Sequence, residues 1–143
     1  MFEKDAGEAM KFYTSIFENS RIVSLVPGPN GSVMGGTIEI DGQRIQTFNG
    51  GPHFKFTSGI SLFVNCENQE EIDDKYEKLS TGGREDRCGW IVDKFGVSWQ
   101  IMPPILGELL SDRDRQKADR VIQVMLKMNK IIIQDLLDAA EGK

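Results

Sequence analysis

The chain has 143 residues, of which 39% are hydrophobic, and this composition is typical of one globular domain or of two half-size units that share a core. A formal net charge of −5 argues against nucleic acid or an anionic membrane surface as a partner, so we expect neither. No apolar run approaches the length of a membrane span, and the first residues lack the basic and apolar regions of a signal peptide.

The first third of the chain predicts one helix followed by three strands. Asp5 and Glu8 have the spacing of a helix capping box, and apolar residues then recur at helical spacing, so we predict a helix over about 6–18. Asn-Gly and Asp-Gly pairs lie between the segments that follow, and these residues favour tight hairpin turns. The predicted strands are 21–26, 33–40 and 43–49.

The same order of elements then restarts. A strand is predicted over 59–66, and Asn68 with Glu71 repeats the capping-box spacing 63 residues after the first. This weak internal repeat predicts two βαβββ units. Only residues 1–4 precede the first helix, so the first strand of the first unit is expected to be truncated, or its role filled in another way. Two further strands, at about 85–92 and 97–102, close the second unit.

The end of the chain has a helical pattern. The prolines at 103–104 are expected to end the last strand, and Ser111–Asp114 resembles a third capping box. An amphipathic helix with several methionines is predicted over 118–128, followed by a short helix over 133–140. We expect the methionine-bearing face to pack on the core or across a dimer.

The stretch Cys88–Ile101 predicts two strands joined by a tight turn at Asp93–Gly96. In the second of these strands Trp99 lies on an apolar face, which favours core packing against a helix. Gln100 lies on the opposite face. Two interpretations of Gln100 remain open: a polar group that faces a small-molecule cavity, and a polar group that faces water.

The single histidine and the two cysteines also have alternative interpretations. His53 could lie at the mouth of a cavity, but an exposed residue between the two halves is the favoured interpretation. Cys88 could be a nucleophile, but its only basic neighbour is Arg87, so a structural thiol is favoured. Cys66 is expected in the core. Both thiols are expected to be reduced, which predicts a cytoplasmic protein.

Several segments resemble the PhnB-like branch of the glyoxalase, or vicinal oxygen chelate, superfamily. They are Glu8–Tyr13, Phe48–Pro52, Ser61–Cys66, Cys88–Ile101 and Leu109–Ile131. The resemblance implies an α+β fold of paired βαβββ units. It predicts a glyoxalase-like domain over 1–104, with halves near 1–52 and 57–104, and a C-terminal helical extension over 105–143. Members of this branch often carry the label 3-demethylubiquinone-9 3-methyltransferase, which is not itself evidence of an activity.

The resemblance also implies a cavity in each curved sheet and, in metal-dependent members, four ligand positions. The last position falls on Gln100, where a chelating enzyme commonly has Glu, and the position that closes the first half falls near Gln46. A third falls on Gly59 or Ser61, and the fourth would lie on the missing first strand. Amide and hydroxyl groups alone would hold a cation weakly, so we expect no catalytic metal and no cofactor.

We therefore expect a small-molecule ligand at a degenerate, metal-poor site, and we assign no catalytic residue. The alternative is an enzyme: a metal-assisted lyase, isomerase or dioxygenase, or a methyltransferase as the family label says. No glycine-rich strand-to-helix turn is present, which argues against a Rossmann-type methyltransferase. Because members of the superfamily pair their halves within or across chains, a homodimer is expected. The ligand-binding candidates are Gln46, Phe48, Asn49, His53, Ser61, Phe63, Gln100 and Met102.

Overall fold

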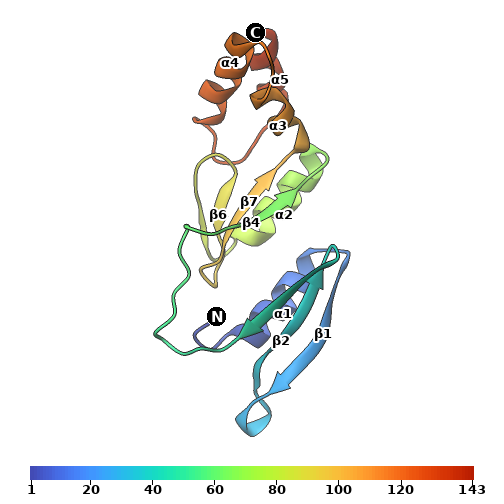
Figure 1. Ribbon diagram of the computed structural model, residues 1–143, viewed down its shortest axis with the longest axis vertical. Coiled ribbons are helices and arrows are strands. Elements are labelled where there is room, and N and C mark those ends of the chain that lie inside the picture. Colours follow the sequence, from blue (N-terminus) through green and yellow to red (C-terminus); the bar gives the residue numbers. More distant parts are fainter. The chain divides into compact units, whose positions relative to one another are not determined.

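The computed structural model describes residues 1–143, which form two compact units, Met1–Phe56 and Thr57–Lys143 (Figure 1). Each unit has one β-sheet with a helix packed on one of its faces, so the predicted α+β class is confirmed. The second unit also contains the helices at the end of the chain. None of the helices combines the length and the apolar character that a membrane-spanning segment needs.

In the first unit, α1 (Ala6–Ile16) precedes an antiparallel sheet with the strand order β1-β2-β3. α1 packs mainly on β2 (Figure 1), and Met10 and Ile38 are fully buried in this unit. One helix followed by three strands is the order that the sequence predicts. The strands are β1 (Ser20–Pro27), β2 (Val33–Ile40) and β3 (Gln43–Phe48), with a 3-10 turn, η1 (Pro29–Gly31), between the first two.

The start of α1 differs from the predicted capping box. Asp5 precedes the helix, but its side chain accepts no hydrogen bond from the first turn. Instead, Oδ1 of Asn49, which follows β3, accepts the N–H of Ala6 at 2.9 Å. The helix also ends at Ile16 rather than near residue 18, because Phe17 adopts an extended conformation and is buried.

The expected first strand of this unit is reduced to one parallel bridge between Phe2 and Asn49. The N–H of Phe2 donates to the carbonyl of Phe48 at 2.8 Å, and the N–H of Gly50 donates to the carbonyl of Phe2 at 2.7 Å. The side chain of Phe2 is buried, so it anchors the first residues of the chain in the core of this unit.

In the second unit, the sheet has the order β4-β7-β6-β5, with β4 parallel to β7 and the other pairs antiparallel. α2 packs on β6 and β7, and the buried side chains Trp99 and Ile101 lie on the sheet face that it covers. The second βαβββ unit predicted from the sequence is therefore present. Its elements are β4 (Leu62–Asn65), α2 (Gln69–Ser80), β5 (Arg84–Glu85), β6 (Trp90–Val92) and β7 (Ser98–Met102).

β4 is shorter than the strand predicted over 59–66. Leu62 pairs with Trp99, close to the start of β7, so the residues before Leu62 have almost no strand to pair with. Ile60, which would share an apolar face with Leu62 in a strand over 59–66, is 83% exposed. The limit of β4 is thus set by its partner strand, which the alternation of residues within 59–66 cannot reveal.

The strand predicted over 85–92 is two short strands, β5 and β6, separated by a loop. Cys88 and Gly89 in this loop have φ angles of 58° and 78°, in the left-handed region, and such angles interrupt a strand. Their N–H groups donate to the carbonyls of Met128 and Asn129 at 2.8 and 2.6 Å, so the loop is held by the C-terminal part of the chain.

The start of α2 confirms the second predicted capping box. Oδ1 of Asn68 accepts the N–H of Glu71 at 2.9 Å. The Glu71 carboxylate in turn accepts the N–H of Glu67 at 2.8 Å, one residue earlier than in the standard box. The first of these bonds satisfies a backbone donor that the first turn of a helix would otherwise leave without a partner, and the second satisfies a donor just before the cap.

The end of the chain has three helices: α3 (Pro104–Leu110), α4 (Arg115–Met125) and α5 (Ile133–Glu141). The prolines end β7 after Met102, as predicted, but α3 is a helix that the sequence pattern did not predict. It begins at Pro104, because proline is well accepted at the first position of a helix. The third predicted capping box would have Ser111 begin a helix. That prediction is wrong, because Ser111 is the residue at which α3 ends. The cap of α4 is Asp114, which accepts the N–H groups of Gln116 and Lys117.

Candidate ligand site on the open face of the second sheet

Gln100 lies near the centre of β7, on the sheet face opposite the one that α2 covers. Strand register places Phe63 of β4 on one side of it and Trp90 of β6 on the other. Gln100 and Trp90 are partly buried, whereas Phe63 is 58% exposed. An amide between two aromatic side chains can combine a directional hydrogen bond with apolar contact, which is the composition of small-molecule sites.

A hydrogen bond joins two of the predicted site residues. Nε2 of Gln100 donates to Oγ of Ser61 at 2.7 Å, and this bond fixes the orientation of the amide. The amide oxygen of Gln100 therefore remains as an acceptor for a ligand. The hydroxyl of Ser98 bonds that of Ser58 at 3.2 Å, so two contacts hold the segment before β4 beside β7.

A buried carboxylate that the sequence analysis did not single out supports this strand. Asp93 is 2% exposed, and it accepts the N–H groups of Phe95 and Val97 at 2.8 and 3.1 Å. Its Oδ2 atom also accepts the indole N–H of Trp99 at 2.8 Å. The N–H of Gly96 donates to the Asp93 carbonyl at 2.9 Å, which confirms the predicted tight turn. The sequence feature that could have indicated this role is an aspartate at the start of a tight turn, followed by a strand that contains a tryptophan.

The remaining candidates are spread over both units. Met102 is 7% exposed and lies against Gly89, so it offers little surface to a ligand. Phe48 is 42% exposed, and like Gln46 it lies on the first sheet's face opposite α1. His53 is exposed in the segment that follows β3, as the favoured interpretation expects.

Asn49 has a structural task. Its Oδ1 atom caps α1, and its Nδ2 atom donates to the carbonyl of Val33 at 3.2 Å. Both ends of the side-chain amide therefore bond within the first unit. In this structure Asn49 therefore caps a helix.

Backbone hydrogen bonds define how the two units correspond. In the first unit the N–H of Phe2 donates to the carbonyl of Phe48 at 2.8 Å. In the second unit the N–H of Cys66 donates to the carbonyl of Met102 at 2.9 Å, and this bond is its counterpart. Counting two residues back along β3 and β7 aligns Gln46 with Gln100. Each unit thus carries a glutamine at the same position of its sheet, on the face without the helix.

Neither cysteine has the surroundings of a nucleophile. Cys66 is 1% exposed, and burial, with a contribution from the Glu71 carboxylate, raises the pKa of its thiol to about 11. Cys88 is partly buried, and its Sγ atom contacts the carbonyl of Met125 at 3.5 Å. These surroundings favour the structural interpretation of both thiols.

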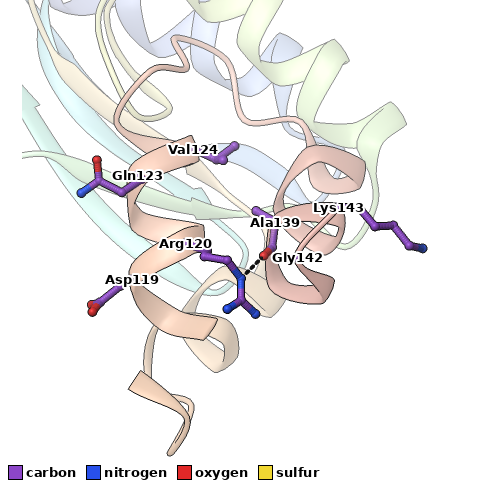
Figure 2. Close-up of a pocket in the computed structure, with 7 residues that line it drawn as sticks. All are labelled: Asp119, Arg120, Gln123, Val124, Ala139, Gly142 and Lys143. Carbon is purple, nitrogen blue, oxygen red and sulfur yellow. Dashed lines mark hydrogen bonds between the residues drawn. The ribbon is translucent and has the colours of Figure 1, made fainter. Parts of the chain in front are cut away.

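A separate depression of about 400 Å³ lies between α4 and α5 (Figure 2). In its wall the guanidinium of Arg120 donates to the carbonyls of Ala139 and Ala140 at 2.9 and 2.8 Å. Figure 2 shows this side chain pointing from α4 to the end of α5. Arg120 therefore acts as a cap for the last carbonyls of α5, and none of the predicted site residues lies here.

Comparison with known families gives a match over residues 1–102, to the family described as 3-demethylubiquinone-9 3-methyltransferase. The chain belongs to this family. The match covers both βαβββ units and ends at the last residue of β7, before the three C-terminal helices.

One solved structure of a similar protein agrees with this family. A PhnB protein from Bacillus cereus, assigned by name to the 3-demethylubiquinone-9 3-methyltransferases, is 37% identical, with a TM-score of 0.67 over 72% of this chain and 94% of its own. Protein PA1353 from Pseudomonas aeruginosa is 17% identical, with a TM-score of 0.57 over 71% and 91% of the two chains, and shares the fold. A Staphylococcus aureus protein is 30% identical over 73% of this chain and 91% of its own, with a TM-score of 0.32. A comparison with curated proteins found no match. The predicted PhnB-like family and glyoxalase-like fold are confirmed.

The donor groups of this 3-demethylubiquinone-9 3-methyltransferase family member do not fit a tightly held catalytic metal. Around Gln100 they are amide and hydroxyl groups, whereas zinc and iron sites use imidazole, thiolate or carboxylate. The turn from β4 to α2, Cys66-Glu67-Asn68, contains no glycine and so does not fit a Rossmann-type methyl-donor site.

Proposed function

We propose that the protein binds a small, largely neutral molecule on the open face of the second sheet. The observation that carries the proposal is the hydrogen-bonded pair Gln100–Ser61 beside the exposed ring of Phe63. Such a site would take a planar or apolar group on Phe63, and a donor group on the amide oxygen of Gln100. No step of catalysis is part of this proposal.

A neutral aromatic alcohol, 2-naphthol, is a suitable probe, because it combines one hydroxyl donor with an apolar ring system. We expect saturable binding in a fluorescence titration. Phe63→Ser and Gln100→Leu should each weaken it about three- to tenfold, because each removes one aromatic contact or one hydrogen bond. Leu126→Ser is the control, since Leu126 is also 50% exposed and follows α4 in the same unit, outside the sheet that carries the site. Equal affinity of all four proteins would refute the proposal.

The alternative is the methyltransferase activity named in the family description. A thermal-shift scan with S-adenosylmethionine and with divalent cations separates the two functions, together with elemental analysis of protein purified without added metal. Binding without catalysis predicts no saturable stabilisation by S-adenosylmethionine and no stoichiometric metal. Saturable stabilisation by S-adenosylmethionine would favour the methyltransferase, and a stoichiometric metal would favour a metal-assisted enzyme.

We further propose that the protein forms a homodimer through the open face of the first sheet. Val26 and Phe48 flank Gly35 on this face and are 43% and 42% exposed, and exposed apolar side chains that adjoin one another are typical of interaction surfaces. We expect light scattering to give the mass of a dimer, and Phe48→Glu to give that of a monomer. A monomeric wild-type protein would contradict this proposal.

The proposal also places the protein in the cytoplasm. Cys66 and Cys88 are both free thiols, and free thiols are typical of proteins in a reducing compartment. Fractionation of cells, with immunological detection of the protein, tests this location. Recovery from an oxidising compartment, with the thiols joined to another molecule, would contradict it.

A further inference from the structure

The dipeptide Asn-Gly occurs twice in the chain, at Asn30-Gly31 and at Asn49-Gly50. In this pair the backbone nitrogen of the glycine can attack the side-chain amide carbon of the asparagine, and asparagine is among the thermally labile residues of proteins. Glycine hinders the attack least, because it has no side chain and its backbone rotates freely. The chain thus places one reactive pair in two different surroundings.

The first pair lies in the loop that joins β1 to β2 (Figure 1). Asn30 and Gly31 are both exposed, and the side-chain amide of Asn30 has no hydrogen-bond partner in the protein. A methyl group placed on Gly31 would meet no atom within 4 Å. No packing against the rest of the unit therefore holds the Asn30 amide or the Gly31 backbone in place.

The backbone of this loop must rotate before the pair can react. Asn30 has φ 56° and ψ 33°, a left-handed conformation in which the Gly31 nitrogen is turned away from the side-chain carbon. Ser32 closes the loop, because its N–H donates to the carbonyl of Pro29 at 3.1 Å and its carbonyl accepts the N–H of Gly28 at 2.8 Å. These bonds lie at the surface, so the loop can open without disturbing the core, and such local opening costs little free energy.

The second pair is held by a hydrogen bond at each reacting group. Oδ1 of Asn49 accepts the N–H of Ala6 at 2.9 Å, and Nδ2 donates to the carbonyl of Val33 at 3.2 Å. The nitrogen of Gly50, which would be the attacking atom, donates its N–H to the carbonyl of Phe2 at 2.7 Å. Reaction at Asn49 would therefore break three hydrogen bonds, and with them the cap of α1 and the bridge between Phe2 and Asn49.

We propose that Asn30 is a site of spontaneous deamidation in the folded protein, and that Asn49 is protected from it. A bond forms between the Gly31 nitrogen and Cγ of Asn30, the bond from Cγ to Nδ2 breaks, and ammonia leaves with the proton of the Gly31 N–H. Water then opens the succinimide ring. Its attack at Cγ gives aspartate, and its attack at the main-chain carbonyl carbon gives isoaspartate. Either product adds one negative charge to the loop.

Tryptic peptide mapping of the full chain, incubated in ¹⁸O-labelled water at mildly alkaline pH, tests this proposal. Cleavage after Arg21, Arg44 and Lys55 leaves the two asparagines on separate peptides, 22–44 and 45–55. Because water opens the succinimide, a converted peptide gains one ¹⁸O atom. In the folded protein we expect about tenfold or more conversion of Asn30 than of Asn49. In concentrated urea, where both surroundings are lost, we expect similar conversion of the two.

Asn30→Gly provides the second arm, because glycine accepts a φ of 56° and removes the amide. On ion-exchange chromatography the incubated wild type should give a more acidic form, and the variant should lack it. Equal conversion of Asn30 and Asn49 in the folded wild type would overturn the proposal, as would an unchanged Asn30. The same amount of the acidic form in Asn30→Gly would also overturn it.

Discussion

Asp93 shows how one side chain can fix the strand that carries the candidate site. Its carboxylate lies next to the β6–β7 turn, is almost fully buried and accepts three hydrogen bonds, two from the backbone and one from Trp99. Because Trp99 directly precedes Gln100, these bonds also determine where the Gln100 amide lies. The cost of burying this charge is offset only while all the donors remain in place.

Replacing Asp93 should therefore lower stability more than any exposed substitution. We expect Asp93→Ala to reduce the free energy of unfolding by about 3 kcal/mol, since it leaves buried donors without an acceptor. Urea unfolding followed by circular dichroism measures the difference. Asp119→Ala, on the exposed side of α4, is the control and should change stability by less than about 0.5 kcal/mol. A similar small effect for Asp93→Ala would contradict this role.

Cys66 gives a prediction for alkaline pH. Burial raises the pKa of its thiol from 9.0 to about 11, so between these values the unfolded chain loses the thiol proton while the folded protein keeps it. The contribution of Cys66 to stability is thus complete below pH 9 and is lost as the pH rises to 11, by about 2–3 kcal/mol. Urea unfolding across this range should show a steeper loss in the wild type than in Cys66→Ala. Parallel curves for the two proteins would count against it.

At the scale of elements, the two sheet-covering helices begin in different ways. α2 is capped by Asn68 within its own sequence, whereas α1 is capped by Asn49, which lies far along the chain. The cap of α1 therefore also ties the end of β3 to the helix. Asp5, the residue with the better local signal, has no such bond.

This difference predicts unequal effects of two substitutions. Asn49→Ala should lower the free energy of unfolding by about 1–2 kcal/mol, because it removes the cap of α1 and the bond to Val33. Asp5→Ala should change it by less than about 0.5 kcal/mol. Thermal unfolding of the two variants makes the comparison, and a larger effect of Asp5→Ala would show that the local capping box is used in solution.

How far the sequence predicts these elements depends on whether the signal is local. Asn68 and Glu71 lie three residues apart, and this local capping signal predicted the start of α2 correctly. The start of β4 depends on the register with β7, and the cap of α1 depends on Asn49, so neither could be predicted from nearby residues. For the site, alternation placed Gln100 on the open face, but the bond to Ser61 required the fold.

At the scale of the whole molecule, the C-terminal helices belong to the second unit through specific contacts. The Gln69 amide donates to the carbonyl of Ile131 at 3.0 Å and accepts the N–H of Ile133 at 2.8 Å. Lys130 pairs with Asp73, and Ile131 is fully buried. The segment between α4 and α5 is thus fastened to α2, on the side of the sheet opposite the candidate site.

The two units repeat one plan, and both place a glutamine on the sheet face that the helix leaves open. Only in the second unit does the structure give that glutamine a hydrogen-bonded side-chain partner, Ser61. This asymmetry is the reason for proposing the binding site around Gln100 and for excluding Gln46 from it.

The most direct test is a nuclear magnetic resonance titration of ¹⁵N-labelled protein with 2-naphthol. The account predicts saturable shifts of the backbone amides of Ser61, Phe63 and Gln100, and of the side-chain amide of Gln100. Phe63→Ser should require several times more probe for the same shifts. Shifts confined to other parts of the chain, such as α4 and α5, or no shifts at the solubility limit of the probe, would contradict it.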